Sequence, residues 1–168
     1  IGLVYQTEGI DTEDGHRLEQ ALDFYRRSAE LKEQLGMSGS LANTLSNMGT
    51  VYRTQKRFAE SLEAQTRALE IRRGENDRVG EARSLNNIGM VLKDLGRYDE
   101  AVALFRESLE IKQSLGVRRE YVNTLLNIAD VHIAAGRSGP GRWHTIGVGR
   151  RVRLVRRMRL HDSHGIRS

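Results

Sequence analysis

The chain repeats itself every 40 residues, and this repeat restricts the possible fold more than any other feature of the sequence. The segment Leu45-Ser46-Asn47-Met48-Gly49 is matched by Leu85-Asn86-Asn87-Ile88-Gly89 and by Leu125-Leu126-Asn127-Ile128-Ala129. A second phase recurs in the same register, as in Ser28, Ala68 and Ser108. Matches in two phases at one period indicate an array of structural repeats.

The spacing within one repeat predicts a pair of helices. A stripe at i, i+3, i+4 and i+7 consists of Leu85, Ile88, Gly89 and Leu92. Gly96 can take the left-handed conformation that ends a helix, and Asp99 and Glu100 place acids in the first turn of the next one. The small residues Gly89 and Ala101 fall where the two helices approach closely, beside the bulky Phe105. Each repeat is therefore expected to be an antiparallel helix pair that stacks on its neighbours.

Applied along the chain, the pattern predicts six helices. Their expected positions are near 16–35, 40–55, 58–73, 79–95, 98–115 and 118–135. A remnant of an earlier helix is expected at Ile1–Gln6, followed by a loop at Gly9–Gly15 that is rich in Asp and Gly.

These positions resemble the signature of the tetratricopeptide repeat (TPR). The matching residues are Leu85, Ile88, Gly89, Leu92, Tyr98, Ala101, Phe105 and Ser108. The 40-residue period resembles the variety seen in kinesin light chain and in many bacterial regulatory proteins. The resemblance implies an all-α fold, a right-handed TPR-type α-solenoid of about three and a half antiparallel helix pairs. The expected domain is 1–136, with repeats at approximately 1–40, 41–80, 81–120 and an incomplete 121–136.

Residues 137–168 break this pattern. They hold nine arginines and one acid, whereas residues 1–136 hold 18 Lys+Arg against 21 Asp+Glu. Where the fourth repeat requires a helix start, the sequence reads Ser138-Gly139-Pro140-Gly141. We expect an Arg-rich tail that is either disordered or non-native, as an out-of-frame translation would produce. Six arginines within Arg150–Arg159 leave binding to nucleic acid or an anionic membrane surface as an alternative.

One asparagine recurs in each repeat on the first helix of the pair, at Asn47, Asn87 and Asn127. An amide offers both a donor and an acceptor, so such a series can bind the backbone of an extended peptide. The resemblance implies a peptide-binding concave face made of Asn43, Asn47, Arg53, Arg83, Asn87, Lys93, Asn123 and Asn127. The alternative is that these asparagines bond to neighbouring helices and serve the structure.

Several function classes are excluded or disfavoured by composition. The chain has no cysteine, which excludes a disulfide framework and a thiolate site. His161 and His164 have a metal-like spacing but no third ligand, and no nucleophile and base form an evident catalytic set. No apolar stretch is long enough to cross a membrane. We expect no enzyme, no cofactor and no metal, and a cytoplasmic protein. Because the sequence begins with Ile1, we also expect a piece of a longer protein.

The predicted function is a non-catalytic scaffold that binds a peptide segment or partner domain in its concave groove. The basic residues Arg53, Arg83 and Lys93 favour an acidic segment or a carboxylate as the ligand. Nucleic acid is the less favoured partner. Alternatives are a regulatory TPR segment of a larger signalling or transcription-regulatory protein, and nucleic-acid binding through the tail. The last helix is expected to leave a stripe uncovered, so self-association through this end is possible. The stripe consists of Tyr121, Leu125, Ile128 and His132.

Overall fold

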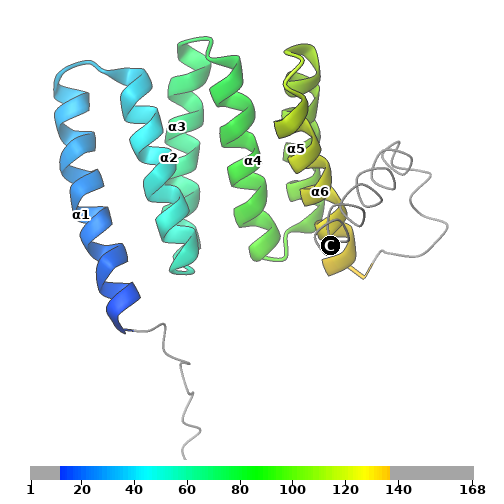
Figure 1. The fold of residues 1–168 in the computed structure, drawn as a ribbon, viewed down its shortest axis with the longest axis horizontal. Helices are drawn as coiled ribbons and strands as arrows, with labels where there is room; N and C mark the ends of the chain where they lie inside the picture. Colours follow the sequence, from blue (N-terminus) through cyan, green and yellow to red (C-terminus); the bar gives the residue numbers. More distant parts are fainter. Residues whose placement is uncertain (1–11, 137–168) are drawn as a thin grey trace, which may run out of the picture. The chain divides into compact units, whose positions relative to one another are not determined.

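The computed structural model describes residues 12–136, and within them it contains six α-helices and no strand (Figure 1). The helices are α1 (Thr12–Gln34), α2 (Ser38–Thr54), α3 (Phe58–Gly74), α4 (Arg78–Asp94), α5 (Tyr98–Ser114) and α6 (Arg118–Ala134). This confirms the all-α fold class. The ends of α2 to α6 lie within two residues of the predicted positions.

The predicted start of α1 is wrong by four residues. The helix begins at Thr12, so the second half of the expected loop Gly9–Gly15 is helical. Asp14 falls in the first turn, where the helix dipole favours an acid, and no atom lies within 4 Å of a Cβ placed on Gly15. The composition of this segment was therefore compatible with a helix start as well as with a loop.

Each helix is followed by a residue with positive φ, and these residues recur every 20 positions. They are Gly36, Lys56, Asn76, Gly96, Gly116 and Gly136, with φ between 57° and 75°. In the α2–α3 loop the Lys56 N–H bonds to the Arg53 carbonyl and the Arg57 N–H bonds to the Tyr52 carbonyl, at 2.9 and 2.8 Å. This pattern closes the end of a helix through one left-handed residue. The three-residue loops thus follow directly from the repeat.

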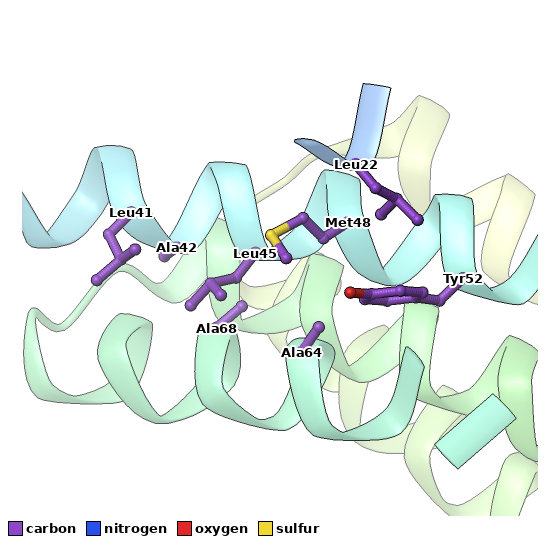
Figure 2. Packing of buried hydrophobic residues seen from close by; sticks show 8 residues of the cluster. All are labelled: Leu22, Leu41, Ala42, Leu45, Met48, Tyr52, Ala64 and Ala68. Atoms are coloured by element: carbon purple, nitrogen blue, oxygen red, sulfur yellow. The ribbon is translucent and has the colours of Figure 1, made fainter. Parts of the chain in front are cut away.

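The chain divides into two compact units, residues 1–71 and residues 72–168. The core of the first unit is formed mainly by α2. Its buried residues are Leu22, Leu41, Ala42, Leu45, Met48, Tyr52, Ala64 and Ala68, drawn in Figure 2. In the same unit the fully buried Gln65 replaces the bulky aromatic of the repeat pattern. Its Nε2 donates to the Ser46 carbonyl at 2.9 Å, and its Oε1 accepts from Ser46 Oγ at 3.2 Å.

In the second unit α4 and α5 form the closely packed pair that the sequence predicts. A Cβ placed on Gly89 would lie 2.7 Å from Cε1 of Phe105, which is itself fully buried. The fully buried Ser108 donates its hydroxyl proton to the Ala82 carbonyl at 2.6 Å. Glycine at position 89 therefore allows the ring of Phe105 to lie against the backbone of α4.

The expected open stripe on α6 is largely absent. Leu125, Ile128 and His132 are at most 8% exposed, and Tyr121 is half-buried. The helix packs along α5 and also contacts α4. We expected these side chains to be covered only by the second helix of the fourth repeat, but most of them are already buried. The burial of these side chains removes the reason given for self-association through this end, and self-association itself stays a prediction.

The predicted remnant helix at Ile1–Gln6 and the Arg-rich tail at 137–168 lie outside the described residues. In the part of the chain that the structure does describe, no helix is long and apolar enough to span a bilayer.

Candidate functional site

The candidate site residues lie on α2, α4 and α6, which are the first helices of their repeats. Each of these helices buries one side in the core, as Leu85, Ile88 and Leu92 do on α4. The side that is not buried carries the polar residues that sequence analysis selected. Because the period is 40 residues, the same positions on the three helices carry them.

On α2, in the first unit, the side chains of Asn43 and Asn47 are exposed and that of Arg53 is half-buried. Between the asparagines lies the buried Thr44, whose Oγ1 accepts a hydrogen bond from Lys32 Nζ at 2.7 Å and donates to the Ser40 carbonyl. The two exposed asparagines therefore precede and follow a buried hydroxyl that is held by hydrogen bonds.

On α4, in the second unit, Arg83 is exposed while Asn87 and Lys93 are half-buried. On α6, in the same unit, Asn123 is exposed and Asn127 is half-buried. All five residues thus retain access to solvent on helices that pack by their other sides.

One of the predicted asparagines bonds to a neighbouring first helix. Asn127 Nδ2 donates to Asn86 Oδ1 at 3.0 Å, and Thr124 Oγ1 lies 3.1 Å from the same oxygen. Sequence analysis did not select Asn86. Its counterparts 40 residues away are Ser46 and Leu126, so no repeated signal marks it.

A second feature that sequence analysis missed is a repeated cation, half-buried in its first copy and buried in the next two. Lys32, Arg72 and Lys112 are 40 residues apart near the ends of the second helices. Each donates to a hydroxyl twelve residues further along the chain. The acceptors are Thr44, Ser84 and Thr124, at 2.7, 2.7 and 2.8 Å. The period alone could have revealed this series.

Burial perturbs two of these cations. Desolvation lowers the pKa of Arg72 below its ordinary value; the nearby Arg83 lowers it further, and Asp77 opposes the shift. Desolvation likewise lowers the pKa of Lys112, against an opposing attraction from Glu120 and with a further lowering by Arg83. Arg83 therefore adds positive potential to a region that already holds two buried cations.

Metal binding and carboxylate chemistry have little support in the described residues. Over residues 12–136, no three His, Asp or Glu side chains come together in a way that could hold a metal ion. The paired carboxylates Glu81 and Glu107 both contact Arg73, at 2.9 and 2.8 Å, so they belong to an ion-pair network. The candidate metal ligands His161 and His164 lie outside the described residues.

Comparison with known proteins identifies the same type of helical repeat. A family model of the tetratricopeptide repeat matches three overlapping segments, residues 12–74, 40–114 and 80–139. No curated protein matches the sequence significantly.

Solved structures are similar in fold. The chain is similar to BtubC (BKLC) from P. vanneervenii, with a TM-score of 0.70 and 19% identity over 91% of this chain. It spans 60% of the length of BtubC. It is also similar to a kinesin light chain-type protein of Podosopora anserina with nearly identical TPR-like repeats. That match has a TM-score of 0.63 and 14% identity, and it covers 86% of this chain and 69% of the other. A point-substituted form of the same protein gives a TM-score of 0.64 and 15% identity, over 88% and 70% of the two chains.

Proposed function

Because the chain belongs to the tetratricopeptide repeat family, we propose that it is a non-catalytic scaffold that binds an acidic, extended peptide segment of a partner protein. TPR arrays are generally protein–protein interaction modules, whereas the fold by itself does not specify the partner. The proposed contact residues are the polar ones of α4 and α6 in the second unit, and separately those of α2 in the first unit.

The observation that carries this proposal is the asparagine that recurs at Asn47, Asn87 and Asn127 on the part of each first helix that is not buried. An interior helix position needs no amide, since asparagine is a weak helix former. Amides on neighbouring helices, whose axes lie about 8–10 Å apart, can bond to peptide groups about three residues apart in an extended chain, whatever its side chains.

The charge of the partner follows from Arg53, Arg83 and Lys93, which add cations to the same helices. Exposed charges steer a ligand of opposite sign and their effect weakens with salt. We therefore expect the bound segment to carry Asp or Glu, and its affinity to fall as the salt concentration rises.

The test is a selection of random peptides of about 12 residues on the full chain, followed by affinity measurements by fluorescence anisotropy. Replacing Asn87→Ala should weaken the selected peptide roughly three- to tenfold, as expected for the loss of one hydrogen bond, with little change in melting temperature. The matched control is Gln113→Ala, which removes an exposed amide from α5.

The outcomes are distinct. Weaker binding by Asn87→Ala alone supports the proposal. If no peptide is enriched, or if both variants bind like the wild type, the proposed surface is wrong. A large fall in the melting temperature of Asn87→Ala would show instead that this asparagine stabilises the helix packing.

A further inference from the structure

A chain of hydrogen bonds runs through α5, α6 and α4 of the second unit and ends at the polar surface. Lys112 Nζ lies 2.8 Å from Thr124 Oγ1, which lies 3.1 Å from Asn86 Oδ1. Asn127 Nδ2 lies 3.0 Å from the same Asn86 oxygen. Lys112 is 4% exposed and Thr124 is fully buried, whereas Asn86 and Asn127 are half-buried. The Lys112 end of this hydrogen-bond chain is therefore buried, and its asparagine end retains access to solvent.

The ammonium group gives this chain a direction. A lysine ammonium has only donors, so Thr124 Oγ1 must accept from it. The single hydroxyl proton of Thr124 then points to acceptors, which are Asn86 Oδ1 and the Glu120 carbonyl, both at 3.1 Å. In the structure Thr124 donates toward Asn86, so Asn86 presents its oxygen inward and Asn127 presents its NH₂ group to that oxygen.

Two polar atoms of these asparagines remain unbonded, the NH₂ nitrogen of one and the amide oxygen of the other. Among the described residues, Asn86 Nδ2 and Asn127 Oδ1 make no hydrogen bond. The two amide groups lie side by side, because Asn127 Nδ2 is hydrogen-bonded to Asn86 Oδ1. In an extended chain each residue directs its own N–H and C=O to the same side, which is the complement of such a pair.

We propose that Asn86 and Asn127 together bind the backbone of one residue of the extended acidic segment, with Asn86 Nδ2 donating to that residue's carbonyl and Asn127 Oδ1 accepting from its N–H. Lys112 and Thr124 act as positioning residues that fix which atom each asparagine presents. The inference rests on the proposed function. It adds Asn86 to the contact residues, states which asparagine donates and which accepts, and names the backbone atoms that are bound.

The fold does not require an amide at this place. Ser46 and Leu126 occupy the positions that correspond to Asn86 in the neighbouring repeats, and both lie in well-formed helices. Arg83 lies one turn before Asn86 on α4 and is exposed, so a carboxylate that flanks the bound residue would find a cation nearby.

The decisive variant is Asn86→Asp. It keeps an oxygen for Thr124 and Asn127 but replaces the remaining donor by an acceptor. The probe is the peptide selected on the wild-type chain. We expect about tenfold or weaker binding, with retained folding. The loss should persist in about 1 M NaCl, where the added charge is screened within a few ångströms. Gln113→Glu adds the same charge at an exposed position of α5 and serves as the control.

A second set of probes replaces one peptide bond at a time by an ester, which removes one N–H. One position should bind about tenfold more weakly to the wild type, and this sensitivity should disappear in Asn127→Ala. If Asn86→Asp does not fold, the side-chain amide protons of Asn86 in the wild type provide the readout, and their NMR signals should shift as the peptide is added.

Unchanged affinity of Asn86→Asp overturns this inference while leaving the proposed function in place. Unshifted Asn86 amide signals at saturation, or ester effects that are equal in the wild type and Asn127→Ala, overturn it as well. Failure to select any peptide overturns the proposed function and this inference together.

Discussion

Replacing Gly89 by alanine should destabilise the protein, although alanine is the better helix former. A Cβ at this position would lie 2.7 Å from Cε1 of Phe105 and 3.0 Å from its Cδ1 and Cζ, well inside ordinary contact. The ring is fully buried, so it cannot move aside into solvent. Overpacking of this kind costs about 1–3 kcal/mol, whereas the helix propensity of alanine returns about 1 kcal/mol. The net change is expected to lie between zero and about 2 kcal/mol of destabilisation.

Gly74→Ala is the matched control, since this glycine is the last residue of α3 and no atom lies within 4 Å of a Cβ placed there. It should be neutral or stabilise the chain by up to about 1 kcal/mol. Urea unfolding of both variants, extrapolated linearly to water, measures the difference. In a Phe105→Leu background the penalty of Gly89→Ala should shrink, because the smaller side chain leaves room. Equal stabilisation by Gly89→Ala and Gly74→Ala would refute the reasoning.

Three further predictions concern single residues. Lys56→Gly should stabilise the chain by up to about 1 kcal/mol in urea unfolding, because Lys56 has a φ of 60° that glycine adopts without strain; a loss of stability would contradict this. Asp77→Ala should cost about 1 kcal/mol in the same assay, because Asp77 Oδ1 accepts from the Gly80 N–H at 2.8 Å and caps α4; an unchanged stability would argue against the cap. The pKa of Lys112 is lowered by burial, so the unfolded chain binds more protons than the folded one between that pKa and the ordinary 10.5. In this pH range the stability of the wild type should rise with pH relative to that of Lys112→Met. Parallel pH profiles of the two proteins would contradict this.

The helices and their ends followed from the sequence because the repeat supplies the same evidence several times. The left-handed residue after each helix recurs every 20 positions, and the close pair Gly89 and Phe105 was recognisable from size alone. The start of α1 was not predictable in the same way. It has no described counterpart in an earlier repeat, and Asp and Gly suit both loops and helix starts.

The site was predictable only where it repeats. The surface positions of Asn47, Asn87 and Asn127 follow from the period, but the bond between Asn127 and Asn86 depends on side chains from two helices. Asn86 has no counterpart of the same type 40 residues away, so no pattern in the sequence marks it. The period marks Lys112 as the third cation of the series Lys32, Arg72 and Lys112, but its burial and its bond to Thr124 are visible only in the structure.

Photocrosslinking tests the central claim most directly, because it locates the bound peptide on the chain. The selected peptide would carry a benzophenone group at each position in turn, and mass spectrometry of the full chain would identify the residues that react. We expect the crosslinks to fall on α2, α4 and α6, at or next to Asn47, Asn87 and Asn127, and to disappear when unlabelled peptide is in excess. Specific crosslinks confined to α3, α5 or residues 137–168 would contradict the account.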